Sequence, residues 1–170
     1  MTTEIHTGPD GGGACPGAAD LELLARWHEV QSGFRRVTDQ LLADVEARSG
    51  LAPSSFQALW FLMTAPERSA PMYQLAGTLG FTTAGTTKVA DRLTEAGLIE
   101  RRPCRSDRRV TLAALTERGL EVAATAARTL ADALRERVVA PLGGTERFAA
   151  LADAVVAVDP EPAGRPPCGS

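Results

Sequence analysis

The segment from Thr82 to Leu115 constrains the fold of this chain more than any other stretch. Its first part has apolar residues at helical spacing and predicts an amphipathic helix over about 82–96, which ends at Gly97. Two short apolar runs follow, around Leu98 and from Val110 to Leu115, and a polar loop over 103–108 separates them. This pattern predicts a strand, a loop and a second strand.

Two shorter helices are predicted before this segment. Ser54 or Ser55 can cap the first of them, which carries an apolar face and ends before Pro66. The second lies between Pro71 and Gly80. Three helices followed by a hairpin is the order of a winged helix-turn-helix domain.

Long helices flank this central part. Apolar residues recur every three or four positions between a cap at Asp20 and a stop at Gly50, which predicts a helix of about thirty residues. Thr116 caps a second long helix that keeps its spacing to Pro141, and a last helix is predicted over 145–158. Helices this long usually pack against more than their own small domain. We therefore predict a mainly α protein with a small β-hairpin wing: a winged helix-turn-helix domain plus a helical dimerisation region.

The two ends of the chain have the composition of flexible tails. Residues 1–17 are rich in glycine, and residues 159–170 contain four prolines. The folded part is therefore expected over about 18–158.

Positive charge is concentrated in the predicted hairpin. Five of the nine residues from Arg101 to Arg109 are arginine, and residues 81–110 hold seven basic and four acidic side chains. The whole chain nevertheless has a formal net charge of −3. On a helical wheel, Thr83, Thr87 and Lys88 share the outer face of the preceding helix, which is small and polar there. A basic hairpin beside such a helix indicates contact with DNA, because Lys and Arg release counterions from phosphates.

Other function classes lack the residues that they need. The sequence has no glycine-rich phosphate loop and no Ser/His/Asp array, so we expect no enzyme. Its three cysteines and two histidines form no metal-binding spacing, so neither a metal nor another cofactor is expected. No apolar run is long enough for a membrane span and no secretory signal is evident, which predicts a cytoplasmic protein.

The run GTTKVADRLTEAGLIERRPCRSDRR, with the downstream Leu115-Thr116-x-x-Gly119, resembles the MarR family of bacterial transcription regulators. The family pattern has a G-T-T-K-x-x-D-R-L recognition segment, a D-x-R wing motif and an L-T-x-x-G. The resemblance implies a homodimer on a pseudo-palindromic operator of double-stranded DNA. It also implies a dimerisation region over 18–50 and 116–158, and a winged helix-turn-helix domain over 51–115.

The resemblance assigns DNA contacts to the start of the recognition helix and to the wing. Arg109 is expected at the minor groove, and Asp107 is expected to hold Arg92 or Arg109 in place. Thr86 lies toward the buried side of the wheel, so packing or capping is an equal alternative for it. Of Arg101 and Arg102, at most one is expected to face DNA, because side chains alternate along a strand. The candidate DNA-binding residues are Thr83, Thr86, Thr87, Lys88, Arg92, Arg105, Asp107, Arg108 and Arg109.

Many members of the family are repressors that a small aromatic or phenolic ligand releases from DNA. Trp27, His28, Trp60 and Met63 are the candidate lining of such a site here, with packing in the core as the alternative. A redox-responsive regulator that acts through Cys104 or Cys15 is a second possibility, because arginines beside Cys104 favour the thiolate. A helical dimerisation scaffold without DNA binding is a third.

Overall fold

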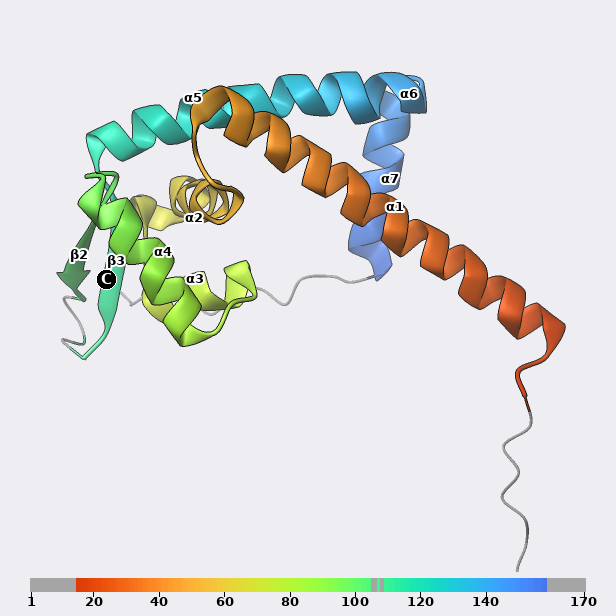
Figure 1. Cartoon of the computed structure of the whole chain (residues 1–170), viewed down its shortest axis with the longest axis horizontal. Coiled ribbons are helices and arrows are strands. Elements are labelled where there is room, and N and C mark those ends of the chain that lie inside the picture. The colour runs from red at the N-terminus through yellow and green to blue at the C-terminus, as the bar shows by residue number, and fades with distance from the viewer. Residues whose placement is uncertain (1–14, 105–106, 108, 159–170) are drawn as a thin grey trace, which may run out of the picture. The chain divides into compact units, whose positions relative to one another are not determined.

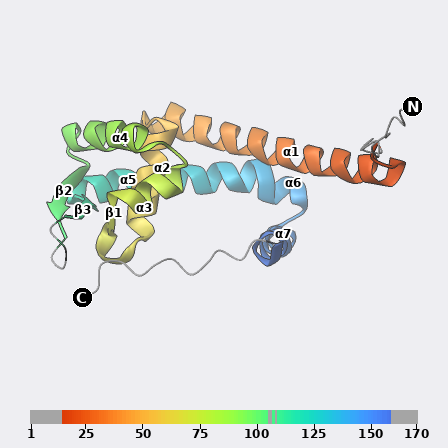
Figure 2. The ribbon, with the colours of Figure 1, turned by 90° about the horizontal axis from the view of Figure 1, so that it is seen from below.

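The structure is a computed structural model of the whole chain and describes residues 15–104, 107 and 109–158. The chain forms two compact units, Met1–Arg36 and Val37–Ser170, whose boundary falls within the first helix. The elements are α1 Ala18–Ser49, α2 Pro53–Thr64, the 3-10 turn η1 Pro66–Arg68, β1 Ser69–Pro71, α3 Met72–Leu79, α4 Thr83–Glu95, β2 Ile99–Pro103, β3 Thr111–Leu115, α5 Glu117–Leu134, the π-helical η2 Arg135–Val139, α6 Ala140–Leu142 and α7 Thr145–Val158. Figure 1 labels the helices and the strands β2 and β3, and Figure 2 labels β1.

The predicted fold class is confirmed, with one addition to the sheet. The sequence predicts a two-stranded hairpin, but the sheet has three antiparallel strands in the order β1-β3-β2. Ala70 pairs with Ala113, and Arg101 pairs with Ala113 from the other side. The sequence pattern missed β1 because a strand of three residues is too short to show alternation.

The second unit holds the winged helix-turn-helix domain. Both Figure 1 and Figure 2 show α2, α3 and α4 gathered beside the small sheet. Their shared core consists of side chains such as Leu59, Leu62, Leu75, Leu93 and Ile99, each at most 2% exposed. This core fixes one face of α4 inward and leaves its opposite face to solvent.

Helix ends follow the predicted chemistry in most places. The side chain of Thr82 caps α4 by accepting a hydrogen bond from the Gly85 amide at 3.2 Å. Gly80 ends α3 with φ of 63°, a conformation that glycine adopts readily. The prediction that Ser54 or Ser55 caps α2 is wrong. The helix begins at Pro53, whose fixed φ suits a first helical position, and Ser55 is buried inside it.

The start of α1 also differs from the prediction by two residues. The helix begins at Ala18, and the carboxylate of Asp20 accepts a hydrogen bond from the backbone amide of Gly17 at 3.3 Å. Asp20 therefore stabilises the start of the helix from within its first turn, and it is not the capping residue itself.

The Leu115-Thr116-x-x-Gly119 motif forms the junction between the sheet and α5. Thr116 Oγ1 accepts from the Gly119 amide at 2.9 Å and donates to the Gly97 carbonyl at 2.8 Å. Gly119 is buried so closely against the chain that an added Cβ would lie 1.8 Å from the carbonyl oxygen of Leu98. Only glycine fits there, so this motif sets how α5 leaves the winged domain.

Within the second unit, α5 also packs against the C-terminal part of α1. Val45, Phe56 and Ala126 form a second core cluster between α1, α2 and α5. Farther along, helical structure continues past Leu134 through the π-helical segment η2, where the Ala140 amide bonds to the Arg135 carbonyl five residues earlier. Pro141 lies directly after this widened turn and has no amide hydrogen to donate.

An ion pair holds η2 to this part of α1. Arg137 Nε lies 2.6 Å from Asp44 Oδ2, and Arg137 Nη2 lies 3.0 Å from Asp44 Oδ1, which is a two-pronged contact. Hydrogen bonding from Arg137 lowers the pKa of the Asp44 carboxyl below its ordinary value of 3.8, and Asp44 raises the pKa of the Arg137 guanidinium.

Candidate nucleic-acid interface

The outward face of α4 is small and polar near its N-terminal end, as the helical wheel predicts. Thr83, Thr87 and Lys88 are exposed, whereas Val89 and Leu93 are buried in the core. Thr86 is only 1% exposed, and its hydroxyl donates to the Thr82 carbonyl at 3.2 Å. This burial favours the packing role of Thr86 over direct contact with a base or phosphate.

A groove runs between α3, the outer face of α4 and the sheet side of the wing. It has a volume of about 580 Å³ and is lined by Met72, Tyr73, Ala76, Thr83, Thr86, Thr87, Arg101, Arg109, Val110 and Thr111. Its walls thus combine the predicted recognition residues Thr83 and Thr87 with the wing residue Arg109. The lining thus brings hydroxyl and guanidinium groups, which are common phosphate contacts, to one concave surface, together with the apolar side chains of Met72, Ala76 and Val110.

Hydrogen bonds of the backbone fold the wing back on itself at its far end. The Cys104 amide donates to the Val110 carbonyl at 2.8 Å, and the Val110 amide donates to the Asp107 carbonyl at 2.9 Å. The carboxylate of Asp107 accepts from the backbone amide of Arg109 at 2.9 Å. Asp107 therefore holds the backbone of Arg109, whereas the sequence predicted that it holds an arginine side chain. Arg105 and Arg108, also predicted to contact DNA, lie outside the described residues.

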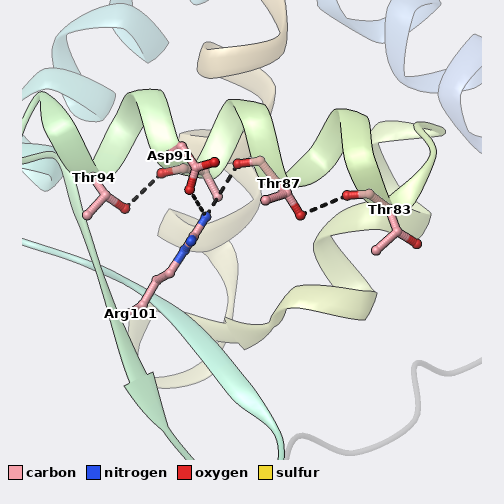
Figure 3. Close-up of polar contacts among 6 residues, drawn as sticks. Thr83, Thr87, Asp91, Thr94 and Arg101 are labelled. Carbon is pink, nitrogen blue, oxygen red and sulfur yellow. Dashed lines mark hydrogen bonds and ion pairs between the residues drawn. The ribbon is translucent and has the colours of Figure 1, made fainter.

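Arg101 has a partner that the sequence did not predict. Its Nη2 atom lies 2.7 Å from Asp91 Oδ1 and donates to the Thr87 carbonyl at 3.3 Å. Figure 3 shows the guanidinium reaching from β2 to α4, between Thr87 and Asp91. The adjacent Arg102 is exposed on the same strand, and Arg92 is exposed in the last turn of α4. The arginines of this region are therefore in different environments.

Tyr73 is a groove residue that sequence reasoning missed. This residue lies at the start of α3, is 56% exposed and lines the groove together with Arg109. No periodic pattern distinguishes an exposed aromatic residue on a short helix from one in the core. Asp91 is an acidic residue on an outer face of α4 that is otherwise polar and basic. That position was the one sign in the sequence that Asp91 has a cationic partner.

The predicted ligand-site residues lie in both units. Trp27 and His28 are exposed in the first unit. In the second unit, Trp60 is 43% exposed and stacks on Phe56 with ring centroids 6.5 Å apart, and Met63 packs against the main core. For Met63 the packing alternative thus has direct support.

The two described cysteines differ in accessibility. Cys104 is 3% exposed, whereas Cys15 is exposed. A buried thiol is poorly placed to react with a soluble oxidant, so this burial argues against Cys104 as a redox sensor.

Comparison with known proteins agrees with this geometry. Residues 49–110 match the model of the MarR family. The structure is similar to AbsC, a MarR family transcriptional regulator from Streptomyces coelicolor, with 26% identity, a TM-score of 0.70, and coverage of 85% of this chain and 95% of AbsC. It is also similar to Sco3205, a MarR family transcriptional regulator from the same organism solved in complex with DNA, with 25% identity, a TM-score of 0.69, and coverage of 90% and 98%.

Residues 49–110 of the chain form a MarR family domain. With this domain and its likeness to AbsC and Sco3205, the chain is a DNA-binding transcriptional regulator and not an enzyme. CouR from Rhodococcus jostii RHA1, solved with bound p-coumaroyl-CoA, shares the fold at 20% identity and a TM-score of 0.63, over 76% of this chain and 90% of CouR. No curated protein matches the chain significantly in sequence. In the part of the chain that the structure describes, every helix is too short or too polar to cross a bilayer.

Proposed function

We propose that this MarR family regulator is a cytoplasmic homodimeric repressor that binds a pseudo-palindromic operator through α4 and the wing. The observation that supports the DNA contact is the groove, which Thr83, Thr87 and Arg109 all line. In this proposal α4 enters the major groove, where Thr87 and Lys88 contact bases or phosphates, and Arg109 reaches the adjacent minor groove. Arg92 contacts the backbone from the far end of α4, together with Arg105 and Arg108.

Exposed apolar side chains support the dimer. Large hydrophobic residues on the N-terminal half of α1 and on α7 are between 46% and 82% exposed: Leu21, Leu23, Leu24, Trp27, Val30, Phe34, Val155, Val156 and Val158. Exposed apolar rows of this kind mark surfaces that a partner covers. A second copy of the chain is the proposed partner, with residues 18–50 and 116–158 as the dimerisation region and 51–115 as the DNA-binding domain.

DNA binding through the wing is tested with two variants. The protein selects its own target from a random-sequence duplex library, and the affinity for that selected duplex is then measured for Arg109→Ala and Asp107→Ala. Both variants are expected to bind more weakly, Arg109→Ala because it loses a cation and Asp107→Ala because it releases the backbone that presents Arg109. Wild-type affinity in both, with intact folding, would refute the proposed wing contact.

We also propose that a small aromatic ligand releases the protein from DNA. Trp60 is its candidate contact in the second unit, and two observations support an aromatic ligand: the exposure of Trp60 and the bound p-coumaroyl-CoA of the structurally similar CouR. The probe is p-coumaroyl-CoA, with coenzyme A alone as control, in a DNA-release assay of wild type and Trp60→Ala. Release of the wild type by the aromatic thioester but not by coenzyme A is expected. Equal release of Trp60→Ala would remove Trp60 from the site.

The redox alternative now depends mainly on Cys15, because Cys104 is buried. Peroxide treatment of wild type and Cys15→Ser before the same DNA-binding assay distinguishes the two mechanisms. Loss of binding only in the wild type would favour redox control over ligand control.

A further inference from the structure

Arg101 makes two contacts with one turn of α4. The Nη2 atom lies 2.7 Å from Asp91 Oδ1, and it donates at 3.3 Å to the carbonyl of Thr87, four residues earlier (Figure 3). A backbone carbonyl has two lone pairs, so the Thr87 carbonyl can accept from Arg101 without losing its helical bond. One guanidinium on β2 thereby joins a backbone atom and a side chain of the helix.

These contacts lie on the proposed DNA-binding face of α4. Thr87 and Arg101 both line the groove between α3, α4 and the wing. The Arg101 side chain is 32% exposed and that of Asp91 is 48% exposed, so the pair lies at the surface. An exposed ion pair contributes little to folding stability. We therefore expect the ion pair to determine the geometry of the groove, because Arg101 belongs to the strand that leads into the wing.

Charge gives a second reason to separate Arg101 from the other wing arginines. A lone Asp91 carboxylate on the outer face of α4 would repel the phosphates of a bound duplex. Arg101 neutralises that carboxylate at 2.7 Å, and its own charge is therefore already balanced within the protein. Arg109 differs from Arg101 in how it is held, since Asp107 binds its backbone amide.

We propose that Arg101 is a positioning residue for operator recognition: by binding Asp91 and the Thr87 carbonyl, it fixes the recognition helix against the wing strand. The inference rests on the proposed contact of α4 and the wing with the operator. Recognition of base edges needs side chains held within about 0.5 Å of their productive position, whereas non-specific attraction to phosphates does not. Loss of the ion pair should therefore reduce specificity more than total attraction to DNA.

The test uses Arg101→Gln, Asp91→Asn and the double variant, with Arg102→Gln as the matched control. Arg102→Gln removes the same charge from the neighbouring, exposed position of the same strand. The measured quantities are affinity for the selected duplex, affinity for a scrambled duplex, the dependence of both on salt, and the melting temperature of each protein. Melting temperature separates a change in DNA recognition from a loss of folding.

Each of the two single variants is expected to bind the selected duplex about tenfold more weakly, a factor within the range that contacting residue pairs show. The double variant is expected to be no weaker than either single variant, because all three lack the same ion pair. Affinity for scrambled DNA should stay close to wild type in the double variant, which loses one charge of each sign. The salt slope of Arg101→Gln should also stay close to wild type, because Arg101 itself binds no phosphate in this proposal. Asp91→Asn is the decisive case, since removing a negative charge should by itself strengthen DNA binding.

Two results would overturn the inference. Tighter binding by Asp91→Asn, together with a salt slope that is lower by about 1 in Arg101→Gln, would make Arg101 a direct phosphate contact. Wild-type affinity in both single variants, while Arg109→Ala binds weakly, would show that the ion pair does not contribute to DNA recognition. The proposed DNA-binding face would then still be correct. Wild-type affinity in Arg109→Ala as well would instead contradict the proposed function.

Discussion

Replacement of Gly119 by alanine tests how α5 is joined to the winged domain. An added Cβ would lie 1.8 Å from the carbonyl oxygen and 2.8 Å from the carbonyl carbon of Leu98, and both are backbone atoms. Real Cβ contacts essentially never fall below 3.0 Å, so the backbone must move by about 1.2 Å. Moving it strains the bonds that Thr116 makes with Gly97 and Leu98. Such overpacking costs about 1–3 kcal/mol or more, and the better helix propensity of alanine offsets up to about 1 kcal/mol.

The expected net loss is about 2 kcal/mol. For a chain of this size that lowers the melting temperature by about 4–8 °C. Circular dichroism at a fixed protein concentration measures this change, since dimer formation makes melting concentration-dependent. Gly77→Ala is the matched control: Gly77 lies within α3 with nothing within 4 Å of its added Cβ, so alanine should raise stability by up to about 1 kcal/mol. Equal melting temperatures for Gly119→Ala and wild type would refute the close approach to Leu98.

Three further outcomes are expected. Asp44→Asn lowers the melting temperature at neutral pH. The folded-state pKa of Asp44 lies below its ordinary value of 3.8. The difference in melting temperature between variant and wild type is therefore complete above pH 3.8 and disappears as the pH falls through the lowered pKa. Equal differences at pH 7 and at strongly acidic pH would contradict this role of the pair with Arg137. Thr82→Ala removes the α4 cap and destabilises the protein by about 1 kcal/mol in denaturant unfolding, whereas an unchanged midpoint would show that the cap contributes nothing. Alkylation of the native protein followed by mass spectrometry should label Cys15 much faster than Cys104, and equal rates would contradict the burial of Cys104.

Local sequence signals predicted most of the fold because strong start and stop residues mark its elements. Gly80, Thr82 and Thr116 each act at the position where the sequence placed a helix end. Failures occurred where the signal was too short or had a competitor. β1 has only three residues, and Pro53 replaced the predicted serine caps because proline is preorganised for a helix start.

The site was predicted less completely because contacts between elements have no local signature. The helical wheel placed Thr87 and Lys88 outward and Thr86 inward, as the structure has them. Strand alternation indicated that Arg101 and Arg102 differ, but it could not show that Arg101 bonds to Asp91 ten residues earlier. That contact depends on how β2 packs against α4, a property of the tertiary structure.

The protein has a formal net charge of −3, and we propose that it nevertheless binds DNA through the basic side chains around α4 and the wing. The most direct test measures the affinity of wild type and Lys88→Ala for the selected duplex over a range of salt concentrations. We predict a steep, linear fall of the logarithm of affinity with the logarithm of salt, and a slope smaller by about 1 in Lys88→Ala. An affinity that does not change with salt, or an identical slope in the two proteins, would contradict the claim.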